Sequence, residues 1–225
     1  MTVFGILATS GMSYPYCTWD FRDFLSNIYE NPKVVIVDNK LDDTFCKTFD
    51  GNTTVIGSLD THNEFSSFQS GMEYIQQDLN PDSIVIFATS AFLNPPTEYI
   101  PAISRNINSL KTKSPTALGY SDSFGESFSI SDLHSSFWLR TSIFALNFSA
   151  LSCLDFTILH DLDFSILASS NLRNHVTSWL SNHPNYKNAD DSLLKKRLFS
   201  IFHEKFLTLS MLNVGISIVD VRKFM

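Results

Sequence analysis

The sequence predicts an α/β fold: a mixed sheet flanked by helices, followed by a helical C-terminal part. The first observation is a pair of apolar runs rich in β-branched residues, 33–38 and 83–88, each of which ends abruptly in polar residues. Such runs are typical of parallel strands that are buried on both faces. The second observation is that the segments between strands carry apolar residues at helical spacing. This alternation indicates a sheet with helices packed on its faces.

In the first half of the chain, strands and helices alternate. Apolar runs predict strands at 3–8, 33–38, 54–57 and 83–88. Thr18 is expected to cap a first helix, which presents one apolar face made of Phe21, Phe24, Leu25 and Ile28. Thr61-His62-Asn63-Glu64 is a capping-box pattern and predicts the start of a second helix. Pro95-Pro96-Thr97 predicts the start of a third.

In the second half the pattern becomes increasingly helical. Apolar runs predict strands at 115–120 and 143–146. Helical spacing then predicts helices near 163–181 and 191–210. Gly215 is expected to end the last helix, and 216–221 has the composition of a final edge strand.

Composition narrows the classes of protein that the chain can belong to. The 225 residues carry a net charge of −7 and no basic cluster longer than 195–197, which argues against a nucleic-acid backbone as partner. No apolar run approaches the roughly 20 residues that cross a bilayer. A secretory signal pattern is missing and the three cysteines are scattered, so we expect free thiols in the reducing cytoplasm.

Common nucleotide-binding and nucleophile motifs are not found in the sequence. Residues 8–12 follow the first strand without supplying the glycine pattern of dinucleotide-binding folds. Neither a phosphate-binding P-loop nor a Ser nucleophile elbow occurs. A nucleotidyltransferase would need a basic residue in a Gly-rich turn after the first strand, and 9–13 has none.

Several stretches occur in an order that resembles a known enzyme family. They are Val37-Asp38-Asn39, Val55-Ile56-Gly57, 63–71 and 81–90, followed by 137–147 and 199–208. This order resembles the GT-A glycosyltransferases, particularly the family-2-like and rhamnosyltransferase-type enzymes of polysaccharide assembly. The resemblance covers about residues 1–220 and rests on the order of loose motifs. It implies one GT-A-like, Rossmann-like domain over 1–225, with a nucleotide-sugar-binding half at 1–110 and an acceptor-side half at 111–225.

The resemblance implies a donor site for a nucleoside-diphosphate sugar, with a UDP-sugar favoured, and a glycan as the acceptor. Asp38 ends the second strand, where it would accept hydrogen bonds from the base or ribose; the alternative is a turn formed with Asn39. Other residues expected to bind the donor are Thr9, Ser10, Asn39, Gln69, Thr89, Ser90 and Arg140. Arg140 suits a diphosphate because its planar fork matches phosphate oxygens, although a surface salt bridge would also use it.

The chain departs from the family where a metal ligand is expected. GT-A enzymes usually carry an Asp-x-Asp-like cluster after the fourth strand, and this chain has 88–94 without an acid there. Three explanations stay open. In the first, Arg140 and other cationic donors offset the diphosphate charge without a metal. In the second, Asp161 or Asp163 holds a Mn²⁺ or Mg²⁺ ion. In the third, the domain binds nucleotide or glycan without catalysis, as a module of a larger assembly.

An inverting transfer needs a carboxylate that accepts the proton of the attacking hydroxyl. Asp122, Glu126 and Asp132 are the candidates, because they follow a predicted strand in a polar segment, and Asp122 is favoured. The alternative for each is a solvated loop, with Asp132 near a helix N-terminus. Trp138 could stack on a sugar or belong to the core, and His203-Glu204 could line the donor site or form a buried pair.

Overall fold

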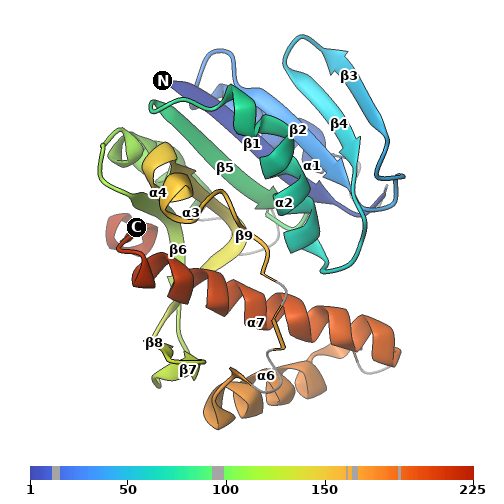
Figure 1. Cartoon of the computed structure of the whole chain (residues 1–225), viewed down its shortest axis with the longest axis vertical. Helices are drawn as coiled ribbons and strands as arrows, with labels where there is room; N and C mark the ends of the chain where they lie inside the picture. The colour runs from blue at the N-terminus through green and yellow to red at the C-terminus, as the bar shows by residue number, and fades with distance from the viewer. Residues whose placement is uncertain (12–15, 93–98, 161, 164–166, 187–188) are drawn as a thin grey trace.

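The computed structural model describes the chain except for residues 12–15, 93–98, 161, 164–166 and 187–188. Its described residues form one large sheet in the strand order β10-β6-β9-β5-β1-β2-β4-β3 (Figure 1). The strands are β1 (Thr2–Thr9), β2 (Lys33–Asp38), β3 (Cys46–Asp50), β4 (Thr53–Gly57), β5 (Ser83–Thr89), β6 (Thr116–Asp122), β9 (Trp138–Asn147) and β10 (Ser217–Asp220). β9 and β3 run antiparallel to their neighbours, and the other pairs are parallel. The mixed sheet is therefore confirmed.

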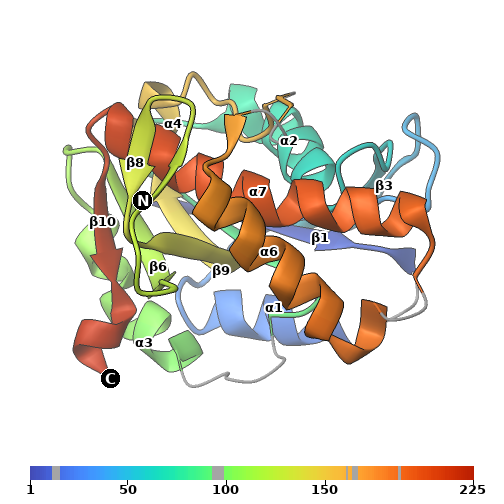
Figure 2. The ribbon, with the colours of Figure 1, turned by 90° about the horizontal axis from the view of Figure 1, so that it is seen from below.

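Helices cover both faces of this sheet (Figures 1 and 2). α1 (Cys17–Ser26) and α3 (Tyr99–Asn106) pack on one face, through residues such as Phe21 and Ile103. α2 (Glu64–Ile75), α4 (Phe148–Cys153) and the C-terminal part of α7 (Asp191–Asn213) pack on the other, through residues such as Phe68 and Leu207. α6 (Ser170–Asn182) lies against α7, and a third apolar cluster joins these two helices to the hairpin of β7 (Phe128–Ile130) and β8 (Leu133–Ser135). The helical C-terminal part is confirmed.

Most predicted elements are present, with some differences. β3 and the β7–β8 hairpin are absent from the sequence-based expectations, and the predicted strand 143–146 is the end of the longer β9. The N-cap of α1 is Tyr16, so the prediction of a Thr18 cap is wrong. The capping box at Thr61 is also wrong, because the N-cap of α2 is Asn63 and the Thr61 hydroxyl bonds to Ser66. The predicted helix start at 95–97 lies outside the described residues.

The strand order creates a switch point between β1 and β5. From β1 the chain moves to β2 and β4 on one side, and then returns to the other side of β1 to form β5. Open α/β sheets bind ligands in the crevice that such a reversal leaves at the carboxyl ends of the strands. Here the two strands end at Thr9 and Thr89, with Ala8 facing Thr89 in the register.

An irregularity in β9 shapes the neighbouring region. On β6, Gly119 pairs with Phe144 of β9, and Ser121 pairs with Leu139. An interval of two residues on β6 therefore faces an interval of five residues on β9. The extra residues of β9 form a bulge, and bulges re-aim side chains. Arg140, Thr141 and Ser142 lie in this stretch.

In the described part of the chain, no helix has both the length and the apolar composition that crossing a membrane requires.

Candidate functional site

Two adjoining cavities lie beyond the carboxyl ends of β1 and β5. The smaller has a volume of about 170 Å³ and the larger about 330 Å³. Glu64, Thr89, Ala91 and Arg197 line both, so the cavities form one continuous groove. The groove begins at the switch point of the sheet and ends between the β9 bulge, α6 and α7.

The smaller cavity collects five of the residues that the sequence suggests for donor binding. They are Thr9, Ser10, Asn39, Thr89 and Ser90. The Thr9 hydroxyl donates to the Val37 carbonyl at 3.4 Å, which fixes its side chain at the strand end. Oδ1 of Asn39 is buried, and no described group donates a hydrogen bond to it. The cavity therefore offers neutral hydrogen-bonding groups and one acceptor that a bound molecule could satisfy.

Asp38 and Gln69 have other partners. Oδ1 of Asp38 accepts the backbone N–H groups of Gly11 at 2.8 Å and Lys40 at 2.9 Å, so this carboxylate organises the loops after β1 and β2. Gln69 faces a separate cavity on the other side of α2. Its Oε1 accepts the N–H groups of Ile158 at 2.8 Å and Leu159 at 3.3 Å, which ties this segment to α2.

The larger cavity brings together Asp122 and Arg140. Nε and Nη2 of Arg140 both donate to Oδ2 of Asp122, at 2.9 and 2.5 Å. Both side chains are about one-third exposed, at 35% and 28%. Glu126 is exposed in the loop after β6, and Asp132 is exposed in the turn between β7 and β8, so no helix begins at Asp132. Neither of these two residues lines the groove.

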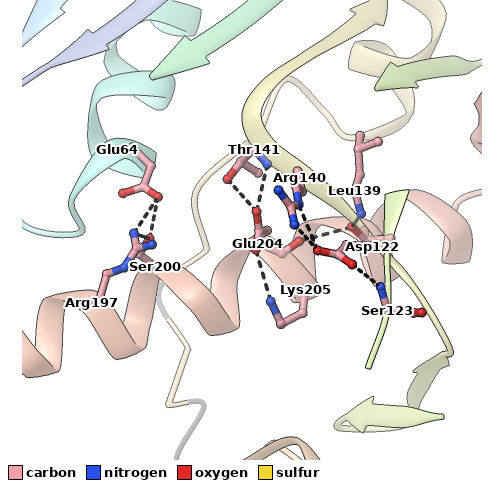
Figure 3. A network of polar contacts seen from close by, with 11 residues as sticks. Glu64, Asp122, Ser123, Leu139, Arg140, Thr141, Arg197, Ser200, Glu204 and Lys205 are labelled. Carbon is pink, nitrogen blue, oxygen red and sulfur yellow. Dashed lines mark hydrogen bonds and ion pairs between the residues drawn. The ribbon is translucent and has the colours of Figure 1, made fainter. Parts of the chain in front are cut away.

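One face of α7 supplies most of the remaining polar groups. Four polar residues of this helix lie at helical spacing and line the larger cavity together with Ile201. They are Arg197, Ser200, Glu204 and Lys205. Figure 3 shows them facing Glu64 and the β9 bulge. Only Glu204 was suggested by the sequence, where apolar residues dominate this helix. Grouping the polar residues of 191–213 by helical face could have identified the stripe.

Glu204 and Lys205 form a largely buried ion pair. Oε1 of Glu204 accepts the N–H of Thr141 at 2.9 Å and its hydroxyl at 3.2 Å. Oε2 of Glu204 accepts from Nζ of Lys205 at 3.2 Å. Nζ of Lys205 lies 3.9 Å from the centroid of the Trp138 ring, an arrangement that favours a cation. Burial nevertheless lowers the pKa of Lys205, against the opposing effect of Glu204.

Glu64 stands where the two cavities meet. Its Oε1 accepts the Ser200 hydroxyl at 2.5 Å, and Nη1 of Arg197 lies 3.9 Å from the same oxygen. The side chain is 14% exposed. Burial raises the pKa of Glu64; Arg197 and the Ser200 hydrogen bond oppose this shift. The sequence placed this residue in a capping box, so its position in the groove was missed.

Aromatic rings form the far wall of the larger cavity. Trp138 is 7% exposed and belongs to the third apolar cluster, yet it also lines the cavity. His175 on α6 stacks on Phe124 with ring centroids 4.5 Å apart. Burial lowers the pKa of His175, and Lys205 adds to this effect. Trp179 on α6, with 38% of its surface exposed, completes the wall.

The residues that the structure describes do not provide a metal-binding cluster. Among these residues, no three His, Cys, Asp or Glu side chains gather as a metal site would need. Asp161, one of the two metal ligands that the sequence suggested, lies outside the described residues. The carbonyl of the other, Asp163, accepts the N–H of Leu167 at 3.2 Å.

Comparisons with known proteins add a distant likeness in structure. No family model and no curated protein matches the sequence. A solved structure of 4-diphosphocytidyl-2C-methyl-D-erythritol synthase matches 88% of this chain and 98% of its own, with 10% identity and a TM-score of 0.42. Mannose-6-phosphate isomerase from Helicobacter pylori matches 98% of each chain, with 11% identity and a TM-score of 0.43. S. aureus TarS 1–349 matches 95% of this chain and 71% of its own, with 11% identity and a TM-score of 0.35. At such low TM-scores the likeness carries no argument about activity.

Proposed function

We propose that this chain is a glycosyltransferase that moves a sugar from a nucleoside-diphosphate donor to a glycan acceptor. The favoured donor is a UDP-sugar, and the transfer inverts the configuration at the anomeric carbon. The continuous groove at the switch point is the observation that carries the proposal. Its smaller part would hold the nucleoside through Thr9, Ser10 and Asn39. Its larger part, with charged side chains and an aromatic wall, would hold the sugar and the acceptor.

The charges of the groove support a diphosphate between these two parts. Arg197 lines both cavities, and Arg140 and Lys205 line the larger one. Fixed cations in a partly buried site stabilise the negative charge that develops on a leaving diphosphate. Thr89 and Ser90, at the end of β5, would add hydroxyl donors beside Arg197. We propose that these groups offset the diphosphate charge without requiring a Mn²⁺ or Mg²⁺ ion.

A domain that binds nucleotide or glycan without catalysis is the second candidate. The observation that favours it is the state of Asp122, the carboxylate that the sequence favours as base. Its Oδ2 accepts two N–H groups of Arg140, and its Oδ1 accepts the N–H of Ser123 at 2.9 Å. A carboxylate held in place by three N–H groups has little freedom to turn toward an acceptor hydroxyl.

A thermal-shift panel of UDP, GDP, CMP and dTDP, each with and without Mn²⁺, tests the donor site. A nucleotide at about 100 times its Kd stabilises the fold by about 2.7 kcal/mol, which is roughly 5–10 °C for a chain of this size. Arg197→Gln should weaken this binding about tenfold, equivalent to about 1.4 kcal/mol. Arg105→Gln is the matched control, since Arg105 is exposed on α3 at the other face of the sheet.

The outcomes separate the two candidates. A shift with one nucleotide, followed by release of the diphosphate from the corresponding sugar donor, supports the transferase. A shift without turnover for any sugar donor supports the binding domain. If no nucleotide stabilises the chain, the donor site is refuted.

A further inference from the structure

Glu64 occupies an unusual place at the beginning of α2. The preceding residue, Asn63, has a φ of 57°, in the left-handed region that non-glycine residues rarely adopt. No side chain caps the helix at Asn63. The Glu64 side chain is directed away from its own helix and toward Ser200 and Arg197 on α7 (Figure 3). A strained backbone that turns a carboxylate into a groove is typical of functional sites.

The carboxylates of the groove differ in how far their oxygens are occupied. Asp122 receives donors on both oxygens, from Arg140 and Ser123. Glu204 also receives donors on both, from Thr141 and Lys205. Glu64 accepts the Ser200 hydroxyl through Oε1, and Nη1 of Arg197 lies 3.9 Å from the same oxygen. Of these three groove carboxylates, Glu64 alone lines both cavities, where the proposed donor and acceptor would meet.

The surroundings of Glu64 favour the protonated form of its carboxyl more than water does. Burial raises its pKa, and Glu204 on α7 adds to the shift. Arg197 and Ser200, also on α7, act in the opposite direction and keep the ionised form accessible. The lining residues from β1, β2 and β5 are uncharged: Thr9, Asn39 and Thr89. A general base works best when its pKa lies near the pH of the reaction.

We propose that Glu64, rather than Asp122, is the general base of the transfer, an inference that rests on the proposed function. The acceptor hydroxyl gives its proton to the Glu64 carboxylate while its oxygen forms a bond to the anomeric carbon. The bond between that carbon and the diphosphate oxygen breaks, and the nucleoside diphosphate leaves with the electron pair. Ser200 holds Oε1 and is a positioning residue. Glu64 then carries the proton, which is released to water after the products leave.

The variant Glu64→Gln tests this role because it keeps the shape of the side chain and removes its basicity. We expect kcat to fall about 100-fold or more, the usual contribution of a general base, while the Kd for the nucleotide stays unchanged. Glu73→Gln is the matched control, since Glu73 is exposed on the same helix and lies outside the groove. Ser200→Ala should move the acidic limb of the pH profile to higher pH, because the Ser200 hydrogen bond favours the ionised form of Glu64. A purely structural role for Ser200 would not produce this change.

A second readout does not require turnover. When the pKa of a carboxyl group is higher in the folded chain than in the unfolded chain, the free energy of unfolding decreases as pH rises through the interval between the two values. Glu64→Gln should therefore melt at a higher temperature than the wild type near pH 8, and this difference should vanish near pH 4.

The results distinguish failure of this assignment from failure of the proposed function. If the wild type turns over a donor and Glu64→Gln keeps more than about a tenth of its kcat, Glu64 is not the base and the transferase stands. An equal melting temperature of the two proteins near pH 8 also overturns the assignment. If the wild type itself turns over no sugar donor, the transferase and its base are rejected together.

Discussion

Glu204 on α7 and Thr141 in the β9 bulge are joined by two hydrogen bonds, at 2.9 and 3.2 Å, to the same carboxylate oxygen. This contact anchors the polar face of α7 to the bulge that carries Arg140. The other oxygen of Glu204 neutralises Lys205, whose side chain is only 3% exposed. The wall of the larger cavity therefore depends on a buried charge pair as well as on apolar packing.

Glu204→Gln keeps an acceptor for Thr141 but leaves Lys205 without its neighbouring negative charge. Removing one partner of a buried pair is costly, and we expect a loss of about 3 kcal/mol in the free energy of unfolding. Urea denaturation measures this loss. The double variant Glu204→Gln with Lys205→Met should recover much of it, because a buried apolar side chain needs no counter-charge. An unchanged urea midpoint for Glu204→Gln would contradict this account.

His203, a fully buried residue of α7, should make the stability depend on pH. Burial lowers its pKa to about 3, with His160 and His62 adding to the effect and the Ile158 carbonyl opposing it. Between about pH 6.5 and 3 the unfolded chain binds a proton that the folded chain excludes, so the free energy of unfolding decreases by about 1.4 kcal/mol per pH unit as pH falls.

Urea denaturation of the wild type and His203→Gln near pH 7 and pH 5 checks this expectation. His203→Gln can still donate to the Ile158 carbonyl but does not titrate, so its stability should fall less over this interval. His134→Gln, at an exposed position of β8, is the control. Parallel pH dependences of all three proteins would show that His203 is not the source.

Gln69→Ala distinguishes a structural role of Gln69 from a role in donor binding. The substitution removes the acceptor of the Ile158 and Leu159 N–H groups, which should cost about 1–3 kcal/mol in the free energy of unfolding. We expect the Kd for the nucleotide to stay unchanged, because Gln69 faces the cavity on the other side of α2. Urea denaturation and isothermal titration calorimetry measure the two quantities. A stable variant with weakened binding would instead assign Gln69 to the donor site.

Gly71→Ala should disturb both stability and the groove. A Cβ atom at Gly71 would lie 2.5 Å from Cγ2 of Ile6 and 3.2 Å from Cγ2 of Val37, so α2 must move away from the sheet. Overpacking of this kind costs about 1–3 kcal/mol, and the shift of α2 would carry Glu64 with it. Gly51→Ala, where a Cβ meets nothing within 4 Å, should change the free energy of unfolding by less than about 0.5 kcal/mol. Equal urea midpoints of the two variants would refute the close packing of α2.

The sequence predicted those elements whose burial leaves a pattern. The runs 33–38 and 83–88 are buried on both faces, and their apolar residues identify β2 and β5. β3 was missed because all five of its residues are exposed at the sheet edge, so burial imposes no alternation on Cys46–Asp50. The caps at Thr18 and Thr61 were mispredicted, because hydroxyl spacing alone does not decide which backbone N–H a side chain reaches.

The site was predictable only in part, for a similar reason. Thr9 and Thr89 end two strands and Asn39 follows a third. Because the ends of these strands must converge, the smaller cavity could be anticipated from local patterns. Arg197, Ser200 and Lys205 reach the groove because α7 docks across the sheet and against β9. That docking depends on contacts between residues far apart in the sequence, which no local pattern records.

The groove also has an order of assembly. The hydroxyl groups of the smaller cavity come from the first 90 residues of the sequence, whereas two cations of the groove, Arg197 and Lys205, come from α7. During synthesis the ribosome releases the switch point long before it releases these cations, since chains emerge from their N-termini. A nascent chain that stops short of α7 would expose a half-built groove with Arg140 but without Arg197 and Lys205. Under the proposed function, the complete set of diphosphate-binding cations would therefore exist only once α7 has docked.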